Sequence, residues 1–273
     1  MSPNPRHLIQ KLLLGAEGEP ISARDAIAAC ALFGIRENSV RVALVRLAAA
    51  GMIEAEARGT YRIGRKAVEL AENVRTWRSA ESRVRKWSGK WIGVHTGALG
   101  RSDRTALRQR GRALALLGFR ELDRGLFVRP DNLVGGVADV RARLYKLGLD
   151  DEAAVFSMDG VDEERDARAR SLWNGKSLTR SYVQWRQRLQ KWLAASEDLD
   201  LESAARESLL LGNEAIRHVV FDPLLPDPLT DVDARRAFVA TLVEFDRAGH
   251  AIWQKLAYRP RLEEAGEGAF VHH

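Results

Sequence analysis

The chain has 273 residues, of which 45% are hydrophobic and 29% charged, and its formal net charge is +6. This balance is typical of a soluble globular protein, and the length predicts two or three domains. No apolar run approaches the ~18–20 residues of a membrane span, and the N-terminus lacks the cleavage site of a signal peptide. The single cysteine, Cys30, excludes an intrachain disulfide and lies in an apolar stretch, which predicts a buried thiol. We therefore expect a cytoplasmic protein.

Positive charge is concentrated in the first half of the chain. Residues 1–86 contain 15 Lys and Arg against 9 Asp and Glu, and residues 87–149 contain 12 against 5. Residues 150–273 are acidic, with 16 Lys and Arg against 23 Asp and Glu. A basic half predicts a polyanionic partner. Charge alone leaves nucleic acid, a membrane surface and CoA-like phosphates open as that partner.

Three helices are predicted near the N-terminus, at residues 5–14, 22–32 and 38–50. Ser22 is a candidate N-cap, with Asp25 in the first turn of the second helix. In the third helix, three aliphatic residues at helical spacing predict one buried stripe: Val40, Leu44 and Leu47.

A β-hairpin is predicted after the third helix, from alternating apolar residues in 52–56 and 60–63 that flank an Arg-Gly turn. Helix–turn–helix followed by a hairpin is the order of a winged helix. We therefore expect a winged helix-turn-helix DNA-binding domain over residues 1–64. Residues 65–86 are charged and predict a helical connector.

Over residues 87–160 the predicted elements become short strands that alternate with helices. Their order is β-α-β-β-α-β, which is the ferredoxin-like pattern. The expected elements are strand 91–94, helix 105–117, strands 119–122 and 126–129, helix 137–147 and strand 153–158. The fold class is therefore α+β.

The last part of the chain is predicted to be helical over residues 161–258, with helices at 178–194, 203–219 and 235–258. The prolines of Phe221-Asp222-Pro223-Leu224-Leu225-Pro226 predict a rigid, extended link between the second and third of these helices. We expect this acidic part to form a dimerisation or effector domain, and residues 259–273 to form a flexible tail.

The third helix carries the strongest functional signal. Opposite its buried stripe, the sequence places polar and small apolar side chains rather than a mixed Glu/Lys surface. Arg and Asn can read purine edges, Val can contact a thymine methyl group and Ser can bind phosphate, while arginines of the hairpin can contact the DNA backbone or the minor groove. The predicted DNA-binding residues are Arg36, Asn38, Ser39, Arg41, Val42, Arg46, Arg58 and Arg62.

Three blocks of the chain resemble the PaaX family, GntR-like winged-helix repressors of phenylacetate catabolism. The blocks are GIRENSVRVALVRLAAAGMI at 34–53, LRQRGRALALLGFRELDRGLFVRP at 107–130, and FDPLLP at 221–226. The resemblance implies a winged helix, a ferredoxin-like middle domain similar to the Cas2 fold, and a helical C-terminal domain. It also implies a homodimeric repressor that an aryl- or acyl-CoA, such as phenylacetyl-CoA, releases from its operator. The chain departs from the family pattern at Phe127, where a tryptophan is usual.

A CoA effector would need cations for its phosphates and an apolar slot for its acyl group. Candidates for the cations cluster at the start of the first middle helix: Arg101, Arg104 and Arg108, with Arg110 and Arg112 beyond them. A solvated basic face or a second contact with the DNA backbone is the alternative for this cluster. Trp185 and Trp192 are the candidates for the acyl slot, and tryptophans at helical spacing are more often core residues.

Two other functions remain open at this point. A Cas2-like domain could support a metal-dependent nuclease, which would need a carboxylate at the end of its first strand. The residues there are Val94-His95-Thr96-Gly97, and Asp103 is distant along the chain. A winged helix could also serve as a protein-interaction module. We expect no catalysis, no cofactor and no metal site.

Overall fold

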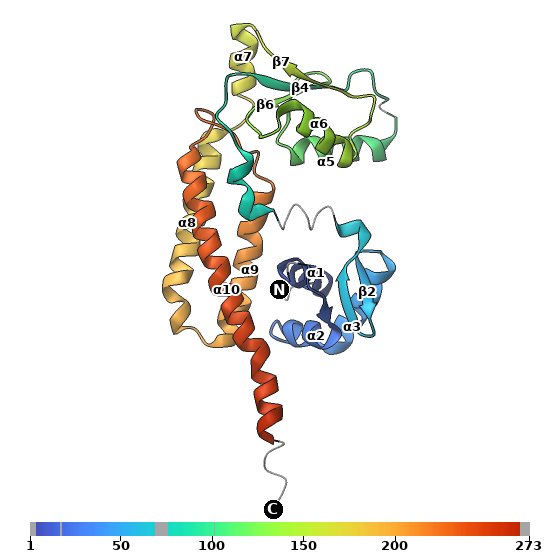
Figure 1. Cartoon of the computed structure of the whole chain (residues 1–273), viewed down its shortest axis with the longest axis vertical. Coiled ribbons are helices and arrows are strands. Elements are labelled where there is room, and N and C mark those ends of the chain that lie inside the picture. Colours follow the sequence, from blue (N-terminus) through green and yellow to red (C-terminus); the bar gives the residue numbers. More distant parts are fainter. Residues whose placement is uncertain (1–3, 17, 69–75, 101, 268–273) are drawn as a thin grey trace, which may run out of the picture. The chain divides into compact units, whose positions relative to one another are not determined.

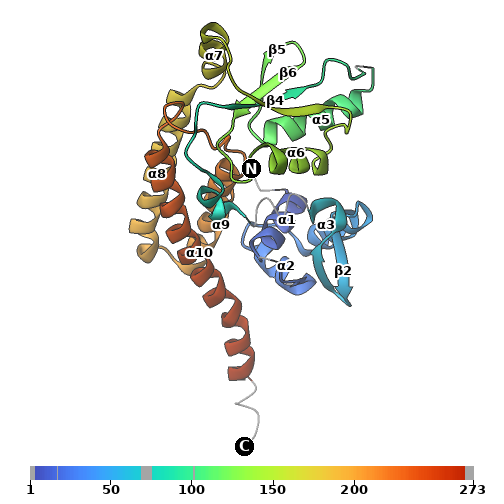
Figure 2. The same ribbon diagram turned by 45° about the horizontal axis from the view of Figure 1, so that its top comes forward.

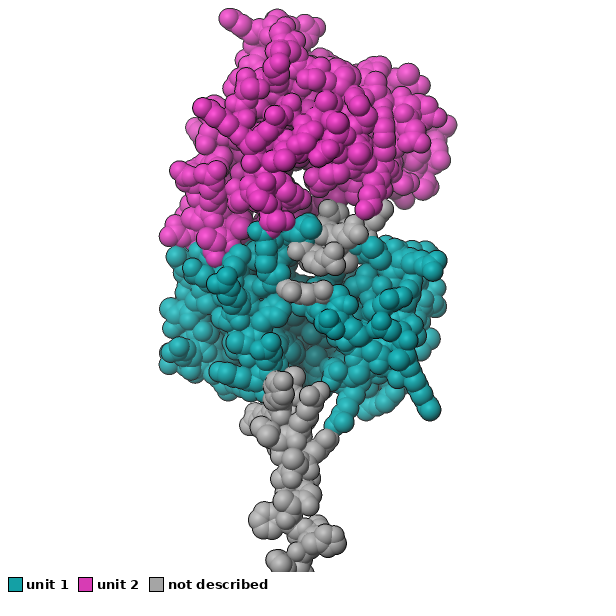
Figure 3. Space-filling view, in the orientation of Figure 1, with its two compact units in different colours: residues 1–78, 187–217, 241–273 teal, residues 79–186, 218–240 magenta. Residues whose placement is uncertain are grey.

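The computed structural model describes residues 4–16, 18–68, 76–100 and 102–267, with side chains as far as residue 256. The chain forms two compact units (Figure 3): unit 1 comprises residues 1–78, 187–217 and 241–273, and unit 2 comprises residues 79–186 and 218–240. The fold is mixed α+β with antiparallel sheets, as predicted.

Unit 1 begins with three short helices and a small sheet (Figure 1). The elements are α1 (Pro5–Gly15), β1 (Ile21–Ser22), α2 (Ala23–Ala31), α3 (Glu37–Ala49), β2 (Ile53–Ala57) and β3 (Thr60–Ile63). The strands are antiparallel and lie in the order β1-β3-β2. The three predicted helices and the hairpin are confirmed, and β1 is a further strand of two residues. We call residues 4–67 the head.

The sequence explains locally why α2 begins where it does. The Ser22 hydroxyl oxygen accepts a hydrogen bond from the backbone N–H of Asp25 at 3.0 Å. The Asp25 carboxylate in turn accepts one from the backbone N–H of Ser22 at 3.4 Å. This reciprocal capping box satisfies two N–H groups that the helix itself leaves unpaired.

An aliphatic core holds the helices of the head together. Its fully buried members include Leu8, Leu13, Val40, Leu44, Leu47 and Ile53. The predicted stripe of α3 is therefore confirmed. Cys30 is buried in the same core, as expected, and burial raises the pKa of its thiol to about 11.

The connector differs from the single helix predicted at 65–86. Residues 69–75 lie outside the described part of the chain. The residues on either side form three short 3-10 helices, η1 (Arg65–Ala67), η2 (Trp77–Ser79) and η3 (Glu81–Arg83). Trp77 and Ala80 are both buried and lie three residues apart.

Unit 2 contains a four-stranded antiparallel sheet in the order β5-β6-β4-β7. Its elements are β4 (Trp91–His95), α5 (Arg104–Leu116), β5 (Arg120–Asp123), β6 (Leu126–Pro130), α6 (Gly136–Lys146) and β7 (Ala154–Met158). The predicted strands and helices of this region are confirmed, in the predicted order. Helices α5 and α6 lie on the same face of the sheet (Figures 1 and 2).

The C-terminal part contains three long helices, which follow the short α7 (Glu163–Arg170). They are α8 (Gly175–Ala195), α9 (Leu201–Val220) and α10 (Val232–Glu267). Helix α10 continues nine residues beyond the predicted end at Tyr258. Residues 268–273 of the predicted tail lie outside the described residues.

The FDPLLP link between α9 and α10 is held by buried polar side chains of unit 2. Asn132 Nδ2 donates to the carbonyl oxygen of Leu224 at 2.7 Å, and Arg235 Nη1 donates to that of Leu225 at 2.6 Å. Arg129 donates to the carbonyl oxygen of Pro223 at 3.5 Å and also to that of Leu117. The carbonyl groups of the link are buried and pair with no neighbouring strand. These side-chain donors supply the hydrogen bonds that such groups need.

Candidate nucleic-acid interface

Helix α3 has one buried face and one exposed face. Val40, Ala43, Leu44 and Leu47 are buried in the head. The exposed surface of the helix contains five of the predicted DNA-binding residues, Asn38, Ser39, Arg41, Val42 and Arg46, and a sixth, Arg36, is its exposed N-cap residue. The helix therefore presents the predicted residues outward on a rigid support.

Two valines on this exposed face are unusual for a helix in contact with water. The exposed fraction is 41% for Val42 and 66% for Val45. Both valines leave much apolar area in water, and that area contributes to folding only when it is buried. An apolar contact with a thymine methyl group would bury them.

The arginines at and within α3 differ in the partners of their side chains. Arg41 Nε donates to the Glu37 carboxylate at 2.8 Å, one helical turn away. The side chains of Arg36 and Arg46 have neither a hydrogen bond nor an ion pair with any residue that the structure describes. Their charges are therefore available to an external anion, whereas that of Arg41 is partly neutralised.

The hairpin contributes the other two predicted residues. Arg58 is exposed at the turn and has no partner within the described part of the chain. Arg62 lies 3.7 Å from the Glu54 carboxylate and 3.9 Å from that of Glu56. Arg65, which is not among the predicted DNA-binding residues, has a side chain that is 95% exposed and lies 3.7 Å from the Glu54 carboxylate. Its position just after the second strand of the hairpin could have identified this arginine from the sequence.

The residues proposed for a CoA site lie in different surroundings. Arg104, Arg108 and Arg112 recur every four residues on the exposed face of α5. Arg110 is buried and donates from Nε to the Asp150 carboxylate at 2.8 Å, which holds the pKa of that carboxyl below its usual value. Arg101 lies outside the described residues.

The two tryptophans proposed for the acyl slot are packed among other side chains. Each is only 7% exposed. The Trp185 ring lies 4.7 Å from that of His218 in unit 2, and the Trp192 ring lies 4.6 Å from that of Phe245 in unit 1. Both therefore contribute to the helical core and offer little surface to a ligand.

Asp103, the next carboxylate along the chain after β4, has a structural role. Asp103 caps α5, and its Oδ1 accepts hydrogen bonds from the backbone N–H groups of Thr105 at 2.7 Å and Ala106 at 3.2 Å. Within the described ranges, no group of three or more His, Cys, Asp or Glu side chains is placed to hold a metal ion. No helix in those ranges is long and apolar enough to cross a membrane.

Known families and structures match most of the chain. The model of the PaaX-like protein family matches residues 4–67, and that of the PaaX-like C-terminal domain matches residues 173–255. None of the curated proteins matches. A solved structure, the uncharacterized protein Rv0674 from Mycobacterium tuberculosis, is 25% identical with a TM-score of 0.55. The similarity covers 90% of this chain and 99% of that one. The two family matches include the first and third blocks described above, and the middle block at 107–130 lies between them.

Proposed function

Because the chain belongs to the PaaX family of transcriptional regulators, we propose that it is a DNA-binding repressor that reads its operator with α3. The observation that carries this proposal is the exposed face of α3. This face combines unpaired arginines with exposed valines on a helix whose other face is buried in the core of the head.

In this proposal the head is a winged helix, and α3 lies in the major groove with its exposed face toward the bases. Asn38 and Arg46 read purine edges, Val42 and Val45 contact thymine methyl groups, and Ser39 binds phosphate. The hairpin is the wing, from which Arg58 and Arg62 contact the backbone or the minor groove. Arg65 adds a further contact with the backbone.

We propose that the repressor acts in the cytoplasm as a homodimer on a pseudo-palindromic operator. The acidic residues 150–273 would be repelled by DNA and are suited to dimerisation and effector binding. The β-α-β-β-α-β region is proposed to be ferredoxin-like and similar to the Cas2 fold. Family membership favours genes of phenylacetate catabolism as targets, with release by an aryl- or acyl-CoA such as phenylacetyl-CoA. The exposed arginines of α5 would then bind the phosphates of the CoA.

The proposal is tested by electrophoretic mobility shift with DNA from the promoter beside the protein's own gene. We expect Arg46→Ala to weaken binding about 5- to 150-fold, the effect of ~1–3 kcal/mol for an arginine contact with a base. Arg41→Ala should weaken binding less, since Glu37 already neutralises part of its charge. The melting temperature should not change, because both side chains are exposed.

Arg186→Ala is the matched control, because Arg186 is an exposed arginine on α8 far from the head in sequence. It should leave the affinity unchanged. If Arg46→Ala and Arg186→Ala bind the promoter equally well, α3 does not read DNA with this face.

A further inference from the structure

Three arginines of unit 2 lie close together although they belong to different elements. Arg83 is the last residue of η3, Arg129 lies on β6 and Arg143 lies on α6. The backbone N–H of Val134, just before α6, donates to the carbonyl oxygen of Arg83 at 2.9 Å. Burial lowers the pKa of Arg83 and of Arg129, and the positive charge of Arg143 lowers both further. The fold therefore gathers three cations in one part of unit 2.

Two of these guanidinium groups are partly buried without an acceptor. The Nε atom of Arg83 is buried and has no hydrogen-bond partner among the described residues. The Arg143 side chain has neither a hydrogen bond nor an ion pair within the described part of the chain. A charged group that loses water and gains no partner is costly, and such groups in native proteins call for an explanation. A bound anion is one such explanation.

The nearby carboxylates do not balance these charges. Asp131 is engaged by Arg85, whose Nη2 lies 2.7 Å from Asp131 Oδ1. Asp139 lies one turn before Arg143 on α6, but the two form no ion pair in the described structure. The Asp139 carboxylate packs against Gly135, where an added Cβ atom would lie only 1.8 Å from Oδ2. With Asp131 engaged, Asp139 is the only carboxylate left to oppose the three arginines, so about two positive charges remain unbalanced among the described residues.

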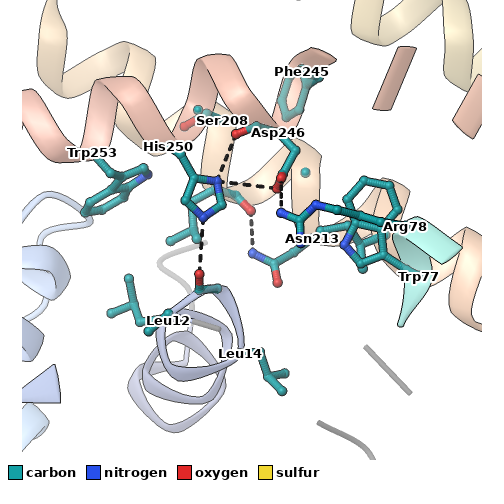
Figure 4. Close-up of a pocket in the computed structure, with 16 residues that line it drawn as sticks. Leu12, Leu14, Trp77, Arg78, Ser208, Asn213, Phe245, Asp246, His250 and Trp253 are labelled. Carbon is teal, nitrogen blue, oxygen red and sulfur yellow. Dashed lines mark hydrogen bonds and ion pairs between the residues drawn. The ribbon is translucent and has the colours of Figure 1, made fainter. Parts of the chain in front are cut away.

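Arginines elsewhere in the chain show the usual alternative, which is pairing with a carboxylate. Two of them are buried and a third is more exposed, and each forms an ion pair within its own unit. The pairs are Arg110–Asp150, Arg235–Glu81 and, beside the pocket shown in Figure 4, Arg78–Asp246. The two arginines at η3 and α6 differ from these because no carboxylate of the described chain is paired with them.

We propose that Arg83 and Arg143 bind a small dianionic oxyanion, either free phosphate or the phosphate group of a monoester. A dianion matches the two positive charges that the described carboxylates leave unbalanced. Guanidinium groups are planar donors whose geometry fits two oxygens of one phosphate group. The anion binds their terminal nitrogens, since the Nε atom of Arg83 is closed to solvent. The bound anion ties the end of η3 to α6.

Arg129 contributes to this site through its charge and not through contact. Its guanidinium is buried and already donates to the carbonyl oxygens of Pro130 and Pro223 and to Asn132 Oδ1. A fixed positive charge in a poorly solvated region raises the local affinity for an anion. DNA suits the site less well, because each phosphodiester of its backbone carries a single charge. The proposal is therefore independent of DNA binding and of the arginines on α3 and α5.

The first test is isothermal titration of inorganic phosphate into the full-length protein at constant ionic strength, maintained with sodium chloride. We expect saturable binding that Arg83→Gln and Arg143→Gln each weaken about tenfold or more, the effect of losing one hydrogen bond from a charged donor. Arg186→Gln is the matched control, because it removes an exposed arginine from α8 in the same unit. It should leave the affinity for phosphate unchanged.

The failure of this test has a clear form. Absence of saturable phosphate binding to the wild type would overturn the proposed site. Equal affinities for the wild type, Arg83→Gln and Arg143→Gln would do the same, because phosphate would then bind elsewhere. A fall in the affinity for promoter DNA on Arg143→Gln, with phosphate binding intact, would assign Arg143 to the DNA backbone and would also contradict the proposal.

Thermal stability gives a second measurement that stays decisive if Arg83→Gln does not fold. In phosphate-free buffer at low salt, Arg143→Gln should melt at the same temperature as the wild type or higher, because it relieves repulsion between cations. Phosphate should raise the melting temperature of the wild type, since a ligand stabilises the state that binds it, and leave that of Arg143→Gln unchanged. An equal rise for both proteins would refute the site.

A comparison of ligands distinguishes the two sources of the phosphate group. Glycerol 1-phosphate that binds more tightly than inorganic phosphate would assign the site to a monoester, and weaker binding would assign it to the free ion. Acetate, which carries one charge, should bind about fivefold more weakly than either, because the attraction scales with the charge of the anion. Acetate binding as tight as that of phosphate would contradict a site for a dianion.

Discussion

Single residues on α3 determine how much charge the head offers to DNA. Arg36 and Arg46 are unpaired within the described part of the chain, whereas Arg41 is tied to Glu37. The Glu37–Arg41 pair is exposed, so it contributes little to stability. Glu37 nevertheless places a negative charge on the face that would meet phosphate groups. It therefore limits the affinity of that face for DNA.

We predict that Glu37→Gln tightens DNA binding about two- to fivefold at low salt, the effect of an exposed charge pair of ~0.4–1 kcal/mol. Removal of the carboxylate frees Arg41 and eliminates a repulsive charge. The measurement is a fluorescence-anisotropy titration of labelled promoter DNA. The control is Glu202→Gln, which removes a glutamate from the first turn of another helix, α9. An equal increase for both variants would mean that net charge alone is responsible.

Among the elements, the FDPLLP link has no secondary structure and is held in place by a buried cation, Arg129. Arg129 is buried and donates to the carbonyl oxygens of Leu117, Pro130 and Pro223. Burial lowers the pKa of Arg129 to about 9, which still leaves the guanidinium charged at neutral pH. This one side chain therefore joins the end of α5, the end of β6 and the link.

We predict that Arg129→Met lowers the free energy of unfolding of unit 2 by about 3 kcal/mol or more, because it leaves several buried carbonyl groups without a donor. Urea denaturation followed by tryptophan fluorescence measures this change. Arg112→Met makes the same substitution on the exposed face of α5 and should change stability by less than ~0.5 kcal/mol. Similar losses for the two variants would show that the hydrogen bonds of Arg129 are not stabilising.

At the scale of the whole molecule, the number of heads on the DNA determines the salt dependence of binding. Each head offers three arginines that the proposed complex places against the DNA backbone or the minor groove, Arg58, Arg62 and Arg65. A dimer would therefore make about six phosphate contacts and a monomer about three. Each contact releases condensed counterions from DNA, so the affinity falls more steeply with salt as contacts are added.

We predict that the logarithm of the association constant falls with the logarithm of salt concentration with a slope of about −5 for a dimer, and of about −3 for a monomer. Titrations of promoter DNA at several salt concentrations give the slope, and analytical ultracentrifugation gives the oligomeric state independently. A flat response would instead indicate a winged helix that binds another protein.

The elements of both sheets and most helices were predictable because their signals are local. The capping box at Ser22, the stripe of α3 and the hairpin around Gly59 each depend on residues within one turn or one strand pair. The exposed face of α3 follows from the same periodicity. The pairing of Arg41 with Glu37 is also local, at a spacing of four residues, and could have been anticipated.

The local elements and the exposed face of α3 can therefore be read from the amino-acid sequence, because helical and strand periodicity assign each side chain to a face. Which distant segments meet is known from the folded chain alone. Tertiary contacts bury Trp185 and Trp192, let Arg129 hold the FDPLLP link, and bring Arg83 near Arg143. These outcomes depend on contacts between residues far apart in the chain, and local periodicity carries no information about such contacts.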